Sequence, residues 1–141
     1  RVIDDLETPN GILITPDDRT LYLVDHNPEP GGARTLVAYE SDDGETWHHA
    51  RVLADFGDGY GGDGMVLDVA GNIYLTVGEG DRAGVTIFSP NGDELGFIPT
   101  GEIAGNCTFG GPELRTLYIA ASTSLYAIEL NIPGQLVYPP H

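Results

Sequence analysis

The hydrophobic residues of this chain come in short runs rather than at helical spacing. The runs are rich in Val, Ile, Leu and Tyr, and turn residues such as Gly, Pro, Asn and Asp separate them. This pattern is typical of β-strands joined by tight turns. It predicts an all-β protein with strands near residues 11–15, 21–25, 35–39, 51–55, 65–69, 73–77, 84–88, 94–98, 107–109, 117–121 and 124–130.

The runs also repeat in a larger unit, which consists of a Gly-containing loop, a strand, a tight turn and a second strand of the form Leu/Ile-Tyr. The tyrosines of these second strands are Tyr22, Tyr74 and Tyr118. Units of about 45 to 50 residues with four strands each are typical of β-propeller blades. We therefore expect one partial β-propeller domain over residues 1–141, with about three four-stranded blades. A stacked β-sandwich is the alternative, although it would not require the repeat.

Three blades do not close a propeller, because closed propellers have about four to eight. The chain opens with Arg1 rather than Met, which indicates a processed or incomplete sequence. Closure is expected to need either a missing N-terminal half or a second copy of the chain, and we favour the first. If nothing precedes Arg1, the outer blades expose apolar faces and unpaired strand edges. We then expect the chain to associate rather than to remain a stable monomer.

The charge balance is strongly acidic, with 22 Asp and Glu against 6 Lys and Arg and a formal net charge of -16. Such a surface disfavours nucleic acid and anionic membranes as partners and favours cations. No apolar run approaches the length of a membrane span. The single cysteine, Cys107, excludes an internal disulfide framework. The compartment stays open between cytoplasmic and periplasmic or secreted.

The candidate chemistry lies where each blade begins, at Asn10, Asp63 and Asn106. The innermost strands of a propeller surround its axis, so side chains at the heads of successive blades are expected to converge. Amide and carboxylate oxygens are hard donors that suit Ca²⁺, Mg²⁺ or Mn²⁺. Taken singly, Asn-Gly and Asp-Gly are also common turn dipeptides. Two ligands on one ion predict that the side-chain oxygens of Asn10 and Asp63 lie within roughly 6 Å of each other.

Four segments resemble one known family in order and at similar spacing. The segments are Pro9-Asn10-Gly11-Ile12 with Leu21-Tyr22-Leu23-Val24-Asp25, Gly62-Asp63-Gly64-Met65 with Gly71-Asn72-Ile73-Tyr74, Gly84-Val85-Thr86-Ile87-Phe88-Ser89-Pro90, and Asn106-Cys107-Thr108-Phe109-Gly110-Gly111. Together they are similar to the C-terminal half of the family of gluconolactonase, senescence marker protein and luciferin-regenerating enzyme.

This resemblance implies a six-bladed propeller with one divalent cation on its axis. It implies that Asn10 and Asp63 are metal ligands and that Asp63 is also the general base, while Asn106 is expected to bind substrate. Ca²⁺ is the expected ion, with Mg²⁺, Mn²⁺ and Zn²⁺ as alternatives. Two family site residues, a Glu and an Asn, belong to earlier blades and have no counterpart here. Gly62 stands where the family has Pro, which predicts a looser loop before Asp63.

The function that follows is a metal-dependent hydrolase that opens a sugar lactone or a similar cyclic ester. The cation would polarise the carbonyl, and Asp63 would accept a proton from water. No Gly-x-Ser-x-Gly motif is present to support an acyl-serine mechanism. The alternative is a non-catalytic propeller fragment that acts as a binding or assembly module, and the missing upstream residues favour it for the isolated chain.

Overall fold

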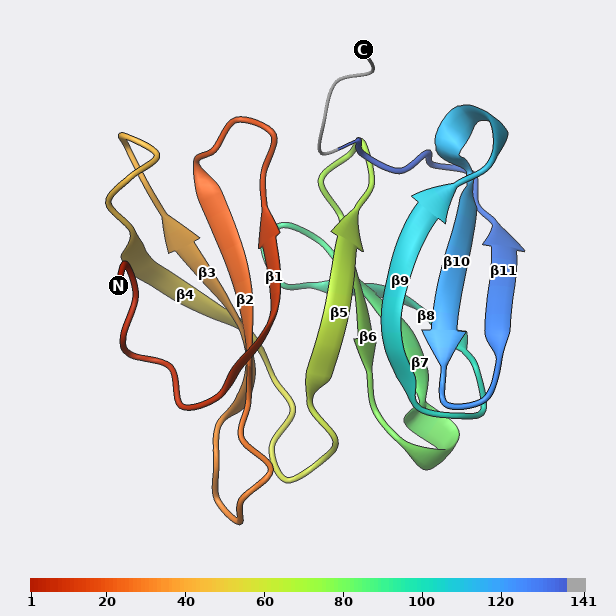
Figure 1. Ribbon diagram of the computed structural model, residues 1–141, viewed down its shortest axis with the longest axis horizontal. Coiled ribbons are helices and arrows are strands. Elements are labelled where there is room, and N and C mark those ends of the chain that lie inside the picture. The colour runs from red at the N-terminus through yellow and green to blue at the C-terminus, as the bar shows by residue number, and fades with distance from the viewer. Residues whose placement is uncertain (137–141) are drawn as a thin grey trace.

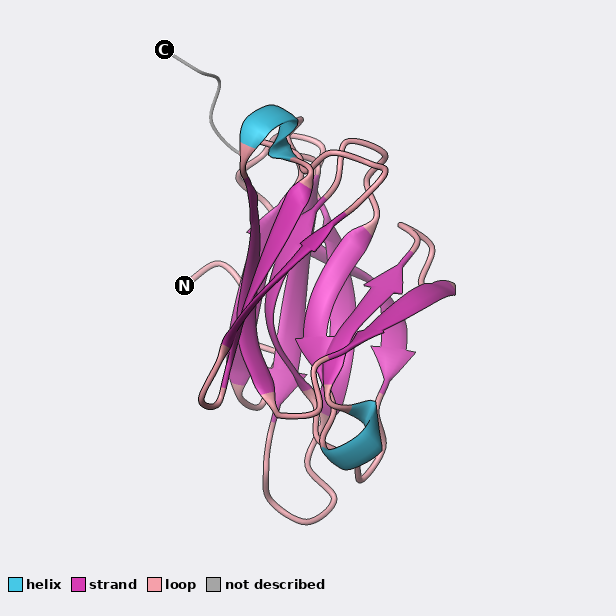
Figure 2. Cartoon of the chain, turned by 90° about the vertical axis from the view of Figure 1, so that its right-hand side faces the viewer, coloured by secondary structure: helices cyan, strands magenta, loops and turns pink. Residues whose placement is uncertain are grey.

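The computed structural model describes residues 1–136 and consists almost entirely of β-strands. Every strand expected from the hydrophobic pattern is present, with ends that differ by at most a few residues. The strands are β1 (Pro9–Ile14), β2 (Thr20–His26), β3 (Arg34–Glu40), β4 (His48–Asp55), β5 (Gly62–Leu67), β6 (Ile73–Val77), β7 (Gly84–Phe88), β8 (Glu94–Pro99), β9 (Ala104–Gly110), β10 (Thr116–Ala121) and β11 (Leu125–Glu129). Two single-turn 3-10 helices, Gly80–Arg82 and Pro112–Leu114, lie at opposite ends of the molecule (Figure 2).

The strands form three antiparallel sheets, which are the blades of a β-propeller. Blade 1 has the order β1-β2-β3-β4, blade 2 has the order β5-β6-β7-β8, and blade 3 has the order β9-β10-β11. Within residues 1–136, blade 3 therefore has three strands, whereas about four were expected. Each blade is a simple meander, because consecutive strands pair across the tight turns that the sequence predicts.

The first strand of each blade lies next to the first strand of the following blade. Strand β5 contacts β1 on one side and β9 on the other. The three strands run in the same direction, so their N-terminal ends gather at one end of the molecule (Figure 1). We call β1, β5 and β9 the inner strands. This arrangement brings Asn10, Asp63 and Asn106, which are far apart in sequence, to the same end.

The hydrophobic core has one layer between each pair of neighbouring blades and a third, smaller cluster on the outer face of blade 1, formed by Leu21, Leu23, Val37 and Tyr39. Between blades 1 and 2, Val24 and Leu36 pack in the same cluster as Ile73 and Leu75, and all four are fully buried. Between blades 2 and 3, the cluster is Val66, Tyr74, Val85, Ala104, Cys107, Leu117 and Ile119. Because side chains alternate across a strand, blade 2 contributes one face to each of the two layers between blades. The packing therefore fixes the spacing of the inner strands.

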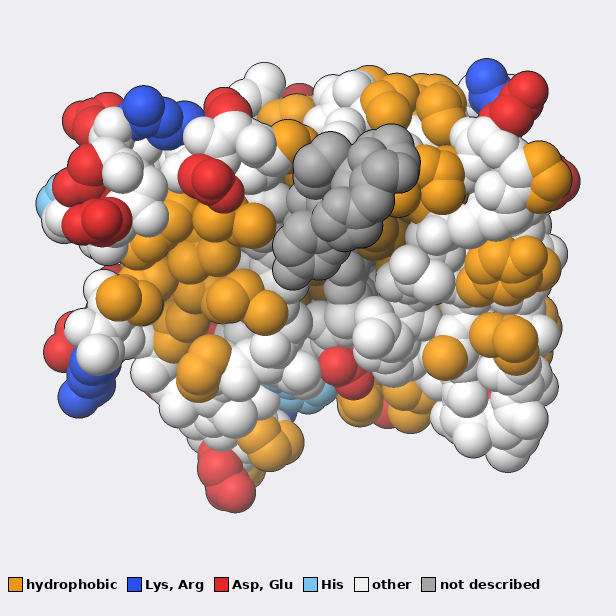
Figure 3. Space-filling model, turned by 45° about the horizontal axis from the view of Figure 1, so that its top comes forward, with side chains coloured by type: hydrophobic (Ala, Val, Ile, Leu, Met, Phe, Trp, Pro, Cys, Tyr) orange, Lys and Arg blue, Asp and Glu red, His pale blue; other side chains and the backbone are white. Residues whose placement is uncertain are grey.

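Hydrophobic side chains also lie on the two outer blade faces. Ile12 on blade 1 is 66% exposed and Leu125 on blade 3 is 72% exposed. Such side chains gather on the side of the molecule that carries blade 1 (Figure 3). Among the described residues, none forms a helix long and apolar enough to cross a membrane.

Candidate functional site

Each inner strand has a β-bulge at its N-terminal end. In blade 1 the register shifts between Pro9 and Ile12, and in blade 2 it shifts between Gly62 and Met65. In blade 3 it shifts opposite Ala120 and Ala121. A bulge inserts one extra residue and turns the local side chains away from the regular alternation. The candidate residues therefore lie in three repeats of one backbone irregularity.

The register of the inner strands shows which positions are equivalent. The second strands have matching residues at Leu23, Leu75 and Ile119. Their partners on the inner strands are Ile12, Met65 and Cys107, in that order. Counting back from them, Asn10 and Asp63 occupy the same position, and Gly105 occupies it in blade 3. Asn106 was expected at this position, but it lies one residue further along its strand, level with Gly11 and Gly64.

Neighbouring inner strands approach each other closely at these bulges. A Cβ placed at Gly11 would overlap the carbonyl oxygen of Asp63, and it would lie 3.1 Å from the carbonyl carbon. A Cβ at Gly64 would overlap the side-chain oxygen of Asn106 and lie 2.6 Å from its Cγ. The glycines are therefore needed for close approach rather than for a left-handed conformation, since neither has a positive φ.

Asp63 and Asn106 share one open pocket. Its volume is about 420 Å³, and it is lined by Tyr60, Asp63, Ile103, Gly105, Asn106, Ala120, Ala121 and Ser122. The carboxylate oxygen Oδ2 of Asp63 lies 3.7 Å from the position that a Cβ of Gly105 would take. Asn10 is exposed on the neighbouring strand and does not line this pocket. The structure thus places Asp63 and Asn106 in one pocket. Asn10 lies outside it, but the next residue, Gly11, lies in close contact with the backbone carbonyl group of Asp63.

The carboxylate of Asp63 differs from the other carboxylates of residues 1–136 that are buried or half-buried, because each of the others accepts hydrogen bonds from the protein. Asp25 accepts hydrogen bonds from the backbone N–H groups of Glu7 and Thr8. Asp68, which is 1% exposed, accepts hydrogen bonds from Ala70 and Asn72. Within residues 1–136 no hydrogen bond or ion pair reaches the Asp63 side chain. A partly buried carboxylate without a protein partner is suited to an external one.

The donor set at this end of the inner strands fits a hard divalent cation. Asp63 supplies a carboxylate, and Asn10 and Asn106 supply amide oxygens, which are ligands that Ca²⁺ and Mg²⁺ accept. Among the described residues, no three His, Cys, Asp or Glu side chains converge. A cation here would therefore be held by one carboxylate together with neutral oxygens, and it would need further ligands from water, substrate or other protein groups.

Two site features were not found from the sequence. Tyr60 lines the pocket, and its ring makes an edge contact with His26, with ring centroids 4.9 Å apart. The His26 ring nitrogen Nδ1 lies 2.9 Å from the carbonyl oxygen of Gly62. No motif could have indicated these contacts, because they depend on how two blades meet.

Cys107 lies beside the pocket residue Asn106 but is not available for chemistry. It is buried, and its thiol donates a hydrogen bond to the carbonyl oxygen of Tyr74 at 3.5 Å. Burial raises the pKa of the Cys107 thiol to about 12. Because the thiolate is the nucleophilic form, Cys107 acts as a core residue rather than a nucleophile.

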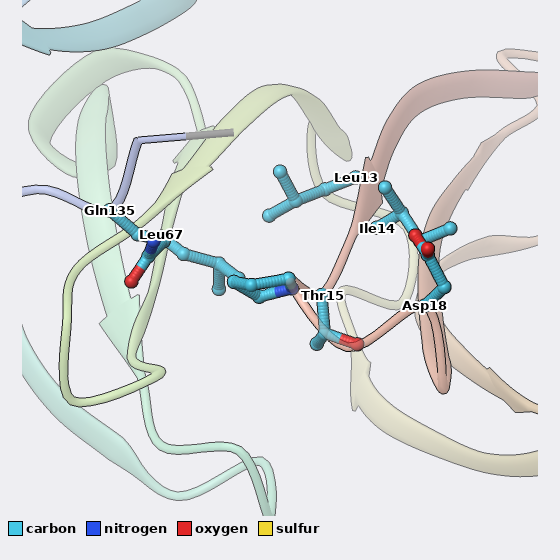
Figure 4. A pocket seen from close by; sticks show the side chains of 7 residues that line it. Leu13, Ile14, Thr15, Asp18, Leu67 and Gln135 are labelled. Atoms are coloured by element: carbon cyan, nitrogen blue, oxygen red, sulfur yellow. The ribbon is translucent and has the colours of Figure 1, made fainter. Parts of the chain in front are cut away.

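A second cavity of about 390 Å³ lies at the other end of the inner strands. Leu13, Ile14, Thr15 and Asp18 line one side of it, and Leu67 and Gln135 line the other (Figure 4). It shares no residue with the pocket that contains Asp63. The candidate residues Asp63 and Asn106 therefore lie at the opposite end of the inner strands from this cavity.

Comparison with known proteins gives a consistent set of similarities. The family model described as the SMP-30/Gluconolactonase/LRE-like region matches residues 1–123. Lactonohydrolase oryH of Aspergillus oryzae is 31% identical over 94% of this chain and 32% of that protein. Gluconolactonase of Zymomonas mobilis is 29% identical over 92% of this chain and 36% of that protein. The chain spans about a third to a half of the length of the curated relatives it matches.

Solved structures agree with the fold. A gluconolactonase from Xanthomonas campestris matches with a TM-score of 0.71 at 32% identity, over 94% of this chain and 40% of that chain. Regucalcin from Agrobacterium tumefaciens, described as a calcium-binding protein, matches with a TM-score of 0.70 at 24% identity, over 94% of this chain and 48% of that chain. The second likeness concerns the fold alone.

Proposed function

Because the chain belongs to the SMP-30/Gluconolactonase/LRE-like family, we propose that it forms part of a metal-dependent hydrolase that opens a sugar lactone or a similar cyclic ester. The observation that carries this proposal is the Asp63 carboxylate, which has no hydrogen-bond partner among residues 1–136 and lies in a pocket shared with Asn106. The names of the related lactonohydrolase and gluconolactonases support lactone hydrolysis as the reaction class.

We assign a separate role to each site residue. Asp63 would hold the cation with its carboxylate and would accept the proton of the attacking water. Asn10 supplies an amide oxygen as a second ligand, and Asn106 contacts the hydroxyl or carbonyl groups of the substrate. The bound divalent cation would polarise the lactone carbonyl and make nearby water more acidic. Ca²⁺ is the proposed ion, in line with the calcium-binding protein of the same fold.

The reaction adds water across the ring ester bond. The water oxygen bonds to the carbonyl carbon, and its proton passes to Asp63. The bond between the carbonyl carbon and the ring oxygen then breaks, and the ring oxygen leaves as a hydroxyl group after it takes up a proton. Asp63 can return the proton it received, so the enzyme ends the cycle in its starting state.

A second candidate is a non-catalytic propeller fragment that serves as a binding or assembly module. The observation that favours it is the single carboxylate at the site, because no three acidic, His or Cys side chains converge within residues 1–136. The curated relatives are also longer: this chain spans only about a third to a half of their length. This difference favours the same candidate for the isolated chain.

The test is a lactone hydrolysis assay that follows acid release, with and without EDTA. It is performed on the 141-residue chain and, if a longer polypeptide carries it, on that polypeptide. We expect EDTA to abolish activity and Ca²⁺ to restore it, with Mg²⁺, Mn²⁺ and Zn²⁺ compared in parallel. Activity that survives EDTA would refute the metal dependence.

The matched variants are Asp63→Asn and Asp58→Asn. Asp58 is exposed in the loop before β5 and lines neither the pocket of Asp63 nor the neighbouring pocket around Phe56. Asp63→Asn removes the base and one negative charge, so we expect turnover to fall by about 10²-fold or more while the thermal midpoint is preserved. Asp58→Asn is expected to behave as wild type. Near-normal turnover of Asp63→Asn at saturating metal would exclude Asp63 as the base.

A further inference from the structure

His26 is the last residue of β2, and it contacts the segments that precede both candidate ligands, Asn10 and Asp63. Its backbone N–H donates a hydrogen bond to the carbonyl oxygen of Thr8 at 2.9 Å, two residues before Asn10. The preceding residue strengthens this attachment, because the carboxylate of Asp25 accepts the N–H groups of Glu7 at 2.8 Å and Thr8 at 2.6 Å. The end of β2 therefore holds the chain just before Asn10.

The side chain of His26 reaches in the other direction, to blade 2. Its Nδ1 lies 2.9 Å from the carbonyl oxygen of Gly62, one residue before Asp63. A carbonyl oxygen can only accept, so Nδ1 carries the proton and donates it. The ring also packs on the loop, since the Cβ position of Gly61 lies 3.4 Å from its Cγ. The edge contact with Tyr60, which lines the candidate pocket, completes the attachment.

We propose that His26 is a positioning residue that fixes the separation of Asn10 and Asp63. This inference rests on the proposed function, in which these two residues hold one cation. The backbone of His26 binds Thr8, two residues before Asn10, and its imidazole binds Gly62, one residue before Asp63. Gly62 is the first residue of β5 and pairs with Val77 of its own blade, and the hydrogen bond from His26 adds a restraint from blade 1. Outer groups that orient ligands in this way typically change metal affinity by about 10- to 100-fold when they are removed.

Three variants separate the hydrogen bond from the packing of the ring. His26→Phe keeps a ring against Tyr60 and Gly61 but removes the donor. His26→Asn loses the ring but places an amide N–H close to the position of Nδ1. His49→Phe is the matched control, because His49 is exposed on β4 and makes a similar edge contact with Tyr39, at 5.4 Å between ring centroids.

The measurements are a Ca²⁺ titration followed by backbone amide NMR shifts, amide hydrogen exchange of residues 62–64 without metal, and lactone hydrolysis. We expect His26→Phe to weaken Ca²⁺ binding by about 10-fold and to speed exchange at residues 62–64. His26→Asn is expected to restore most of the Ca²⁺ affinity and most of the protection from exchange. His49→Phe is expected to match wild type in both measurements. For turnover, we expect kcat to fall in His26→Phe with little change in KM.

The outcomes distinguish this inference from the proposed function. If wild type neither binds Ca²⁺ nor hydrolyses a lactone, the proposed function fails, and the positioning role fails with it. If wild type does both and His26→Phe keeps wild-type affinity and exchange, only the role of His26 is overturned. A loss in His26→Phe that His26→Asn does not rescue would also overturn it, because the packing of the ring would then be responsible.

Discussion

The close approach of β1 to β5 predicts that Gly11 cannot be replaced even by alanine. The added Cβ would overlap the carbonyl oxygen of Asp63 and lie 3.1 Å from its carbonyl carbon and 3.3 Å from Cε of Met65. The methionine tip can move aside, but the carbonyl group belongs to the backbone of β5. To accept the methyl group, the two inner strands must separate by on the order of 1 Å.

The magnitude follows from two opposing effects. Without steric conflict, Gly→Ala stabilises a protein by about 0.4–1 kcal/mol, because the unfolded chain loses freedom. Overpacking against a rigid group costs about 1–3 kcal/mol or more. Because the clash is an overlap with a backbone carbonyl group, the cost should lie at or above the top of this range, and we expect Gly11→Ala to lower the free energy of unfolding by about 2–3 kcal/mol. For a chain of this size, that corresponds to a fall in Tm of roughly 6–12 °C.

The assay is thermal unfolding followed by circular dichroism, with two comparison variants. Gly96→Ala is the control, because Gly96 has no positive φ and its Cβ would meet only Cδ1 of Ile87 at 3.7 Å. Its Tm should stay level or rise slightly. Gly64→Ala should lie between the two, since part of its conflict is with the Asn106 side chain, which can rotate. If Gly11→Ala unfolds within about 2 °C of Gly96→Ala, the inner strands do not meet as described.

Two further predictions concern titratable groups. At pH 8, iodoacetamide should alkylate Cys107 roughly 10³-fold more slowly in the folded chain than in urea, because burial raises the pKa of the thiol to about 12; equal rates would show that Cys107 is exposed. Hydrogen bonds from Ser124, Tyr126 and Thr123 lower the pKa of Glu102 from 4.5 to about 2, so its contribution to stability is present above pH 4.5 and is lost as the pH falls toward 2. Between pH 4.5 and 2, the Tm of Glu102→Gln should therefore fall less steeply than that of wild type. The exposed control Glu45→Gln should follow wild type. Parallel Tm curves for Glu102→Gln and wild type would contradict the lowered pKa of Glu102.

The strands were predictable from the sequence because their signals are local. The run Leu21-Tyr22-Leu23-Val24, for example, identifies β2 without reference to any other part of the chain. The convergence of Asp63 and Asn106 was also predictable, since it follows from the repeat and from the general geometry of propellers. Blade 3 was expected to have about four strands, and residues 1–136 provide three.

The details of the site could not be predicted, because they depend on pairing between strands. Asn106 begins its segment much as Asn10 and Asp63 begin theirs, yet the bulge places Gly105 level with them. The contact of His26 with Gly62 joins residues 36 positions apart, and no local pattern encodes it. The separation of the Asn10 and Asp63 side-chain oxygens stays a prediction of roughly 6 Å, which a structure with bound cation can test.

The repeated bulge has an evolutionary consequence. Because the backbone alone forms it, a duplicated blade inherits a place for a ligand whether or not it keeps a ligand side chain. In blade 3 that place is held by Gly105, whose missing Cβ faces the carboxylate of Asp63 at 3.7 Å. A single codon change could therefore add or remove an oxygen donor there without altering the architecture. In this chain one backbone irregularity thus carries three different residues at the same position, Asn10, Asp63 and Gly105.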